Sequence, residues 1–159
     1  MKTERYFRIE KKLSDPSRIV GGILRDLPEH FGFESAIVDY MVDSRSPQFT
    51  TLVAFDIQEK PIGFIMMRDN NADVAEIWVL GVLKSAQNRG VGRALVEAGE
   101  REALQSGHKY VFLKTIGPAQ NDPNYLSTYH FYLRNGYLLL DQWDYFWSGS
   151  WCAFLVKKL

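Results

Sequence analysis

The sequence predicts a single domain of mixed α/β class, in which strand-like and helix-like segments alternate along the chain. The chain has 159 residues, of which 46% are hydrophobic and 14% aromatic, enough for one ordinary domain with an apolar core. Segments with two-residue alternation of apolar side chains are interleaved with segments in which apolar residues recur every three or four positions. We therefore expect residues 1–159 to form one unit.

The first half of the chain is expected to hold a strand, two helices and three further strands. Asp15-Pro16 is typical of a helix start, Gly32 breaks the helical pattern, and the polar residues 58–61 are typical of a hairpin turn. The expected segments are residues 6–13 (strand), 16–26 and 34–44 (helices), and 49–57, 62–67 and 73–83 (strands).

The second half is expected to hold a helix, a strand, a helix and a final hairpin. Apolar residues recur with helical spacing from Val91, Pro123 is typical of a first helical position, and Asn135-Gly136 is a stop signal. The expected segments are residues 91–107 (helix), 110–116 (strand), 123–136 (helix), and 137–147 and 151–157 (strands).

Charge and cysteine content narrow the classes of function. With 19 basic and 19 acidic residues, the sequence offers no electrostatic reason to expect a nucleic acid or a membrane surface as partner. The single cysteine, Cys152, excludes an internal disulfide framework and is expected to be a small buried hydrophobe. No apolar run approaches the roughly 20 residues of a membrane span, and the start of the sequence lacks a signal-peptide core. A cytoplasmic protein is therefore expected.

A glycine-containing turn joins the strand at 73–83 to the helix at 91–107. Such a turn leaves the first N–H groups of the helix unpaired, and these attract an anion together with the helix dipole. Glycines let the backbone approach a bulky pyrophosphate, and arginines can pair with its charge. The alternative is that the glycines only cap and turn the chain. The residues concerned are Gln87, Asn88, Arg89, Gly90, Val91, Gly92 and Arg93.

Two motifs resemble the GNAT superfamily of acetyl-CoA-dependent N-acetyltransferases. Gln87, Gly90 and Gly92 fill its cofactor turn, Gln/Arg-x-x-Gly-x-Gly/Ala, and FYLRNGY at 131–137 is similar to its helix ending in Tyr-x-x-x-Gly-Phe/Tyr. Residues 27–44 and 115–137 are also similar to one GNAT subgroup, so the resemblance covers most of the chain. It implies a mixed, mostly antiparallel sheet of about seven strands, flanked by about four helices and splayed between its fourth and fifth strands to admit acetyl-CoA.

The resemblance assigns backbone contacts with acetyl-CoA to Leu80, Gly81 and Val82. In the family a bulge on the fourth strand binds the pantetheine arm and the acyl oxygen, and Gly81 fits such a bulge or is a plain packing glycine. Backbone donors that face an oxygen gaining negative charge contribute roughly 3 kcal/mol. Asn124 is a further candidate, although the family often has asparagine one place later, where this chain has Tyr125.

Tyr132 is the expected general acid, because it begins the Tyr-x-x-x-Gly spacing. A phenol with a pKa of about 10 can protonate the departing thiolate, whose conjugate acid has a pKa of about 8.5. Tyr125 and Tyr129 share its helix face, and such a stripe is more typical of core packing.

Glu76 is the expected general base that removes a proton from the acceptor amine. It lies four residues before Leu80, so the two side chains share a face of the strand if no bulge intervenes. The alternative is an exposed cross-strand charge. Some relatives use a glutamate on the fifth strand, where the nearby charged residue here is Lys114.

Other residues give weaker signals. His30 lies between the first two helices, where the family places its acceptor, and an ordinary loop histidine is the alternative. His108, His130 and Cys152 have no metal-ligand spacing, so no metal is expected. The aromatic residues between positions 143 and 151 either wall an acceptor site, pack on the sheet or meet a second copy in a homodimer.

The sequence thus predicts an N-acetyltransferase that moves an acetyl group from acetyl-CoA to a primary amine of a small molecule or peptide, by direct attack in a ternary complex. Two alternatives remain. One is a non-catalytic acyl-CoA-binding sensor or interaction domain of the same fold, and the other is a nucleotide-binding regulatory module that uses the same loop.

Overall fold

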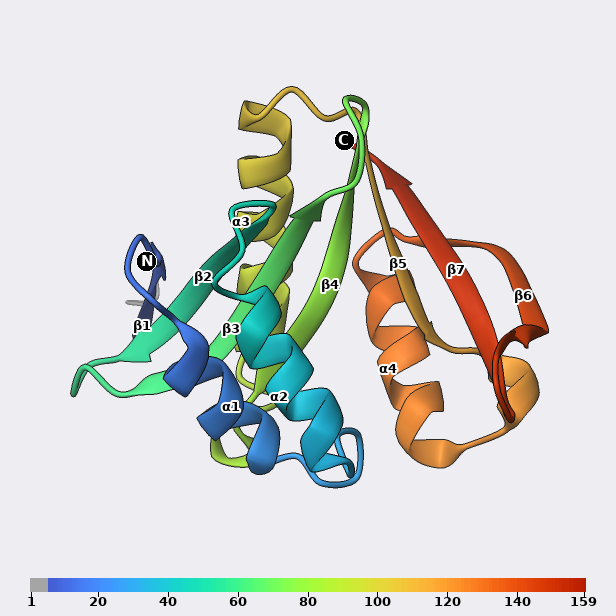
Figure 1. Ribbon diagram of the computed structural model, residues 1–159, viewed down its shortest axis with the longest axis horizontal. Coiled ribbons are helices and arrows are strands. Elements are labelled where there is room, and N and C mark those ends of the chain that lie inside the picture. The colour runs from blue at the N-terminus through green and yellow to red at the C-terminus, as the bar shows by residue number, and fades with distance from the viewer. Residues whose placement is uncertain (1–5) are drawn as a thin grey trace.

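The computed structural model describes residues 6–159, and its centre is a seven-stranded sheet with the order β1-β2-β3-β4-β5-β7-β6 (Figure 1). The predicted order of strands and helices is confirmed, with ends shifted by a few residues. The strands are β1 (Phe7–Lys11), β2 (Phe49–Asp56), β3 (Pro61–Asp69), β4 (Val74–Val82), β5 (Tyr110–Ile116), β6 (Leu138–Trp147) and β7 (Ser150–Lys158). The helices are α1 (Ser17–Arg25), α2 (Glu34–Asp43), α3 (Val91–Gln105) and α4 (Pro123–Arg134), with short 3-10 turns η1 (Lys84–Ala86) and η2 (Pro118–Gln120).

The sheet opens between β4 and β5, its one parallel pair of neighbours. The pairing runs only from Val74 opposite Tyr110 to Ile77 opposite Leu113. Beyond Ile77 the two strands diverge, as Figure 1 shows for the green and orange arrows. All other neighbouring strands are antiparallel. The expected mixed sheet with a splay between its fourth and fifth strands is therefore confirmed.

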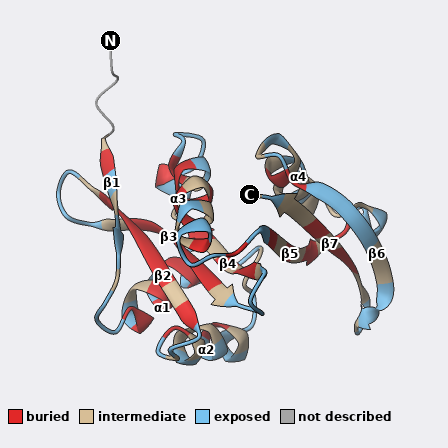
Figure 2. Ribbon diagram, turned by 90° about the horizontal axis from the view of Figure 1, so that it is seen from above, coloured by how far each residue is buried: buried red, intermediate tan, exposed pale blue. Residues whose placement is uncertain are grey.

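The helices cover both faces of the sheet, and each face has its own apolar core. Seen from above, α1 and α2 lie on one side of the strands and α3 and α4 on the other (Figure 2). Val20, Leu24 and Phe64 belong to the cluster on the α1–α2 face. Leu95 and Tyr132 belong to the cluster on the α3–α4 face. Among residues 6–159, no helix is long and apolar enough to cross a membrane.

A β-bulge lies in β4 at Trp78, four residues before the end of the strand. Met66 of β3 pairs with Val79 and Met67 pairs with Ile77, so Trp78 is the extra residue. The expected bulge at Leu80, Gly81 and Val82 is wrong, because these three residues pair regularly with Ile65, Phe64 and Gly63. The bulge coincides with the point where β4 leaves β5.

Gly81 is instead a packing glycine. A Cβ atom there would lie 3.1 Å from Ile23 Cγ2 and from Phe64 Cε1, and 3.3 Å from Leu24 Cδ2. These distances are too short for a well-packed core to accept without a shift. The missing side chain therefore lets α1 approach β4 closely.

Candidate active site

The turn between β4 and α3 presents an open helix N-terminus. Gly90 is the N-cap of α3 with φ of +83°, a left-handed conformation that glycine adopts without a steric cost. No side chain caps this helix. The first backbone N–H groups, from Val91 to Arg93, therefore remain available to an anion.

Two polar side chains hold this turn in shape. The Asp26 carboxylate, just after α1, accepts a hydrogen bond from the backbone N–H of Lys84 at 3.0 Å. Gln87 Nε2 donates to the carbonyl oxygen of Val82 at 3.0 Å. The side chain of Gln87 thus connects the turn to the end of β4, which accounts for a glutamine at the start of the motif.

The two arginines of the turn are exposed but have different partners. Arg93 Nε donates to Glu97 Oε1 at 2.9 Å, one helical turn further on. The guanidinium carbon of Arg89 lies 4.0 Å from the centroid of the Tyr6 ring. The turn therefore carries two cations, of which only Arg93 is paired with a carboxylate among the described residues.

Helix α4 packs beside the same turn. A Cβ atom on Gly92 would meet the ring of Phe131 at 3.4 Å, an ordinary van der Waals contact. The position therefore has room for a methyl group but is close to α4. The turn at residues 87–93, called the phosphate turn here for its expected role, therefore lies beside the helix that carries Tyr132.

Tyr132 lies in the core of the α3–α4 face, only 6% exposed. Its ring makes edge-on contacts with Phe131 and Tyr137, at centroid distances of 5.1 and 5.7 Å. Burial raises the pKa of the Tyr132 phenol well above its usual value. The hydroxyl therefore keeps its proton at neutral pH.

A polar network fixes the C-terminal end of α4. The Tyr137 hydroxyl donates to Glu100 Oε1 at 3.0 Å, and Lys157 Nζ donates to the same oxygen at 2.9 Å. Lys157 Nζ also donates to the carbonyl oxygen of Asn135 at 2.9 Å. Because these residues come from α3, β7 and the end of α4, the network holds the helix of Tyr132 against the sheet.

Glu76 lies on the other face of the sheet. Its neighbours Ala75 and Ile77 belong to the α3–α4 core, so strand alternation turns Glu76 toward α1 and α2. The bulge at Trp78 then reverses the alternation, and Leu80 packs on the α3–α4 side. Glu76 and Leu80 therefore do not share a face, because the condition of that expectation, a strand without a bulge between them, is not met.

The Glu76 carboxylate is buried between two cations. The residue is 1% exposed, and its oxygens lie 3.1 Å from Lys114 Nζ and 3.4 Å from Arg68 Nη1. Both cations flank the Trp78 ring, at 5.3 and 5.1 Å from its centroid. Trp78 Nε1 donates to the Asp43 carboxylate of α2 at 2.9 Å. The alternative of an exposed cross-strand charge at Glu76 is excluded.

Only some of the aromatic residues between positions 143 and 151 lie on the same face of the sheet as Glu76. Trp143 and Phe146 both pack on Phe154 of β7 at 5.0 Å, and Lys114 Nζ lies 5.7 Å from the Phe146 centroid. Tyr145 is 77% exposed. These aromatic side chains therefore continue the face of the sheet on which Glu76 lies, along β7 toward the edge strand β6.

A contact between α4 and the α1–α2 connection spans the opening of the sheet. The Tyr125 hydroxyl donates to the carbonyl oxygen of His30 at 3.0 Å. The two rings meet edge-on at 5.1 Å, and His30 Nε2 lies 3.4 Å from the Asn124 carbonyl oxygen. Asn124 is therefore at the mouth of the opening and contacts the connection through its backbone. The sequence offered no signal for this contact.

The remaining candidates take structural positions. Cys152 is buried in β7, and burial raises the pKa of its thiol to about 11, so it stays protonated. The His108 ring is buried, with Nδ1 3.2 Å from the Ala103 carbonyl oxygen. Within residues 6–159, no three His, Cys, Asp or Glu side chains are grouped to hold a metal ion.

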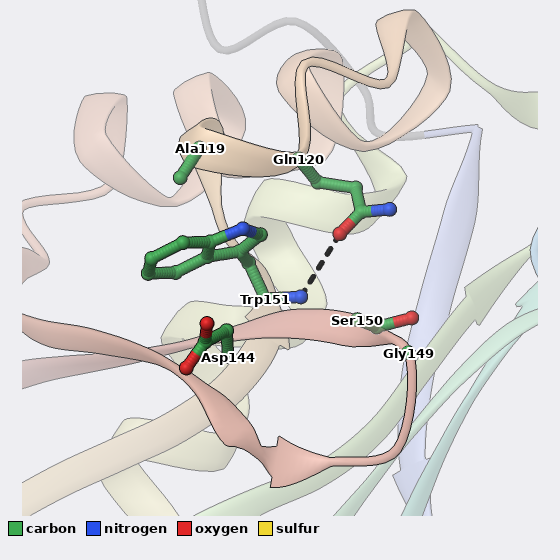
Figure 3. A pocket seen from close by; sticks show the side chains of 6 residues that line it. All are labelled: Ala119, Gln120, Asp144, Gly149, Ser150 and Trp151. Atoms are coloured by element: carbon green, nitrogen blue, oxygen red, sulfur yellow. Dashed lines mark hydrogen bonds between the residues drawn. The ribbon is translucent and has the colours of Figure 1, made fainter.

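A shallow pocket of about 400 Å³ lies elsewhere, at the turn of the β6–β7 hairpin (Figure 3). A hydrogen bond joins two of its lining residues: the backbone N–H of Trp151 donates to Gln120 Oε1 at 2.9 Å. Of the residues predicted for the site, only Trp151, one of the aromatic residues between positions 143 and 151, lines this pocket, and β5 and β7 separate the pocket from β4. It is lined by Ala119, Gln120, Asp144, Gly149, Ser150 and Trp151.

The sequence matches a family model described as the acetyltransferase (GNAT) family over residues 15–137, more than half of the chain. The match contains the phosphate turn, Glu76 and Tyr132, and ends at Tyr137. No curated protein sequence matches the chain.

Solved structures share the fold at low sequence identity. An aminoglycoside 6'-N-acetyltransferase in complex with coenzyme A has a TM-score of 0.76 at 17% identity, covering 95% of this chain and 96% of its own. The aminoglycoside 6'-N-acetyltransferase of Enterococcus faecium has a TM-score of 0.75 at 20% identity, with the same coverage. A GNAT family acetyltransferase of Elizabethkingia anophelis with acetyl-CoA bound has a TM-score of 0.74 at 15% identity, covering 98% and 100%.

Proposed function

This chain belongs to the GNAT family of acetyltransferases, and we propose that it transfers the acetyl group of acetyl-CoA to a primary amine by direct attack in a ternary complex. One observation carries the proposal. The sheet opens between β4 and β5, the phosphate turn lies where β4 ends, and the candidate acid and base lie on opposite faces beside the opening. Two substrates approaching from opposite faces would meet at the opening.

The residues of the phosphate turn fit the diphosphate of acetyl-CoA. The first turn of α3 is uncapped, Gly90 takes the positive φ that exposes it, and Arg89 and Arg93 add charge. Along the opening, the β4 residues Leu80, Gly81 and Val82 have no pairing with β5, so their strand can bind the pantetheine arm. Asn124 faces the same opening from α4. Acetyl-CoA supplies an activated thioester carbonyl there.

Tyr132 acts as the general acid. Its phenol carries a proton at neutral pH, so its hydroxyl can hydrogen-bond to the thiolate that leaves and supply the proton that the thiolate takes up. Its ring packs in the apolar α3–α4 core, which fixes the position of this donor.

Glu76 acts as the general base through water. Since the carboxylate is almost fully buried, the amine donates its proton to Glu76 indirectly. Trp78, Asp43 and the aromatic residues on β6 and β7 lie on the same face and contact the acceptor.

The acceptor is a small molecule or a peptide with a free amine. Three of the structural neighbours are aminoglycoside acetyltransferases, so aminoglycosides are the first acceptors to assay here. We also propose that the whole chain is one catalytic domain that works in the cytoplasm, and that its exposed edge strand β6 permits a homodimer.

A ligand screen followed by an activity assay tests the proposal. At 100 times its dissociation constant, acetyl-CoA should stabilise the protein by about 2.7 kcal/mol, whereas ATP and NAD should not. A library of aminoglycosides, polyamines, amino acids and peptides is then assayed for release of free CoA thiol. Binding without turnover on any amine would favour the sensor alternative, and stabilisation by ATP alone would favour the nucleotide-binding alternative.

A further inference from the structure

The ring of Tyr6, at the start of the described chain, lies against the phosphate turn. The guanidinium carbon of Arg89 is 4.0 Å from the ring centroid, well inside the roughly 6 Å range of cation–π contacts. Tyr6 packs on the α3–α4 core and meets Phe7, the first residue of β1, edge-on at 5.2 Å. The ring is therefore held by the edge strand of the sheet rather than by the turn itself.

The guanidinium groups of Arg89 and Arg93 have different partners. Arg93 is engaged with Glu97 in an ion pair. Within residues 6–159, Arg89 forms no ion pair with a carboxylate, and its contact is the Tyr6 ring. An aromatic ring contacts the face of a guanidinium, whereas the N–H donors point outward in its plane. The stacked Arg89 thus keeps its donors free for an anion.

We propose that Tyr6 is a positioning residue that holds the guanidinium of Arg89 ready to bind a phosphate group of acetyl-CoA. The proposal rests on the proposed function, since it assumes that acetyl-CoA occupies the turn between β4 and α3. A long arginine side chain loses rotamer freedom when it binds a ligand, and a side chain that is already held loses less. Tyr6 therefore contributes to affinity without touching the ligand.

The ring carries this role, and the hydroxyl does not. The Tyr6 hydroxyl oxygen is buried and has no hydrogen-bond partner among residues 6–159. Tyr6→Phe should therefore bind acetyl-CoA as the wild type does, within two-fold. Tyr6→Leu keeps apolar bulk but removes the aromatic face. It should weaken binding two- to five-fold, the range that an exposed cation–π contact provides.

Calorimetric titration of acetyl-CoA into a double-mutant cycle tests the proposal. Arg89→Met should weaken binding about ten-fold and reduce the salt dependence of the affinity, because one charge contact with phosphate is lost. In the Arg89→Met background, Tyr6→Leu should have no further effect. Arg93→Met is the matched control, because Arg93 is paired with Glu97, whereas the cation over the Tyr6 ring is Arg89. In that background the two- to five-fold effect of Tyr6→Leu should persist.

Three results would overturn the proposal. An equal effect of Tyr6→Leu with and without Arg89 would show that Tyr6 acts only through packing. Unchanged affinity in Arg89→Met would show that Arg89 does not bind phosphate, whatever the Tyr6 variants do. Both results leave the proposed function intact, because wild-type protein still binds acetyl-CoA. No binding of acetyl-CoA to the wild type would overturn both the positioning role and the proposed function.

Discussion

Glu76 and Tyr132 lie on opposite faces of the sheet, one beside α1 and α2 and the other in the core under α3 and α4. The opening between β4 and β5 connects these two faces, because the two strands are not paired beyond Ile77. The proposed acid and base would therefore act on different molecules. Tyr132 is on the side of the phosphate turn, and Glu76 is on the face where we propose that the amine binds.

The hydroxyl of Tyr132 should be needed for turnover. Tyr132→Phe deletes only this group and should lower kcat by about ten-fold or more, the low end of general acid catalysis, with little change in the affinity for acetyl-CoA. Steady-state kinetics with the best amine measures this. Turnover at the wild-type rate would show that Tyr132 is a packing residue and that another group or water protonates the thiolate.

The carboxylate of Glu76 should matter most near neutral pH. Glu76→Gln keeps the shape but removes the basic site, so the rate should fall by about 100-fold at pH 7. The loss should shrink as pH rises toward the pKa of the amine, about 10, because neutral nucleophile then forms without help.

A pH–rate profile checks the role of Glu76, and a thermal melt is its control. Glu76→Gln leaves Lys114 and Arg68 without their carboxylate, so some loss of stability is expected. If the profile of a folded variant runs parallel to that of the wild type, Glu76 has a structural role only.

Charge at Gly92 should decide cofactor binding. Gly92→Asp places a carboxylate at the first turn of α3, where it favours the helix but repels phosphate. We expect acetyl-CoA affinity to fall more than ten-fold in a folded protein, and reversal of both Arg89 and Arg93 to glutamate should act in the same way.

Gly92→Ala is the matched control, because its methyl group makes only a van der Waals contact with Phe131. Calorimetry should give an affinity for acetyl-CoA near that of the wild type. Equal affinity of the Asp and Ala variants would remove this turn from the binding site.

Alkaline pH should destabilise the protein through its buried tyrosines. Burial raises the pKa of Tyr132 and of Tyr137, and the nearby Glu100 carboxylate raises that of Tyr137 further. Above about pH 10 the unfolded chain loses these protons while the folded chain keeps them. The unfolded state then binds fewer protons, so the free energy of unfolding falls by about 1.4 kcal/mol per pH unit for each such tyrosine.

Urea unfolding between pH 8 and 11 measures this loss. Tyr137→Phe should be less stable at pH 8 by about 1.5–3 kcal/mol, because it lacks the hydrogen bond to Glu100, and should lose less stability as pH rises. The exposed Tyr145→Phe serves as the control and should follow the wild-type curve. Parallel curves for Tyr137→Phe and the wild type would contradict the prediction.

The sequence by itself determined the order of the strands and helices and the position of the phosphate turn. These depend on local properties, which are the period of apolar residues and the freedom of Gly90 to take a positive φ. The family motifs identified the same turn and the helix of Tyr132, and the family match includes both.

Only the tertiary structure decided which face each site residue occupies. The bulge at Trp78 exists because Met66 and Met67 of β3 pair with Val79 and Ile77, a relation between strands that β4 alone does not encode. The same holds for the stack of Arg89 on Tyr6, whose partners are distant in sequence. Local sequence sets φ and periodicity, whereas register and long-range contacts arise from how the whole chain buries its apolar surface.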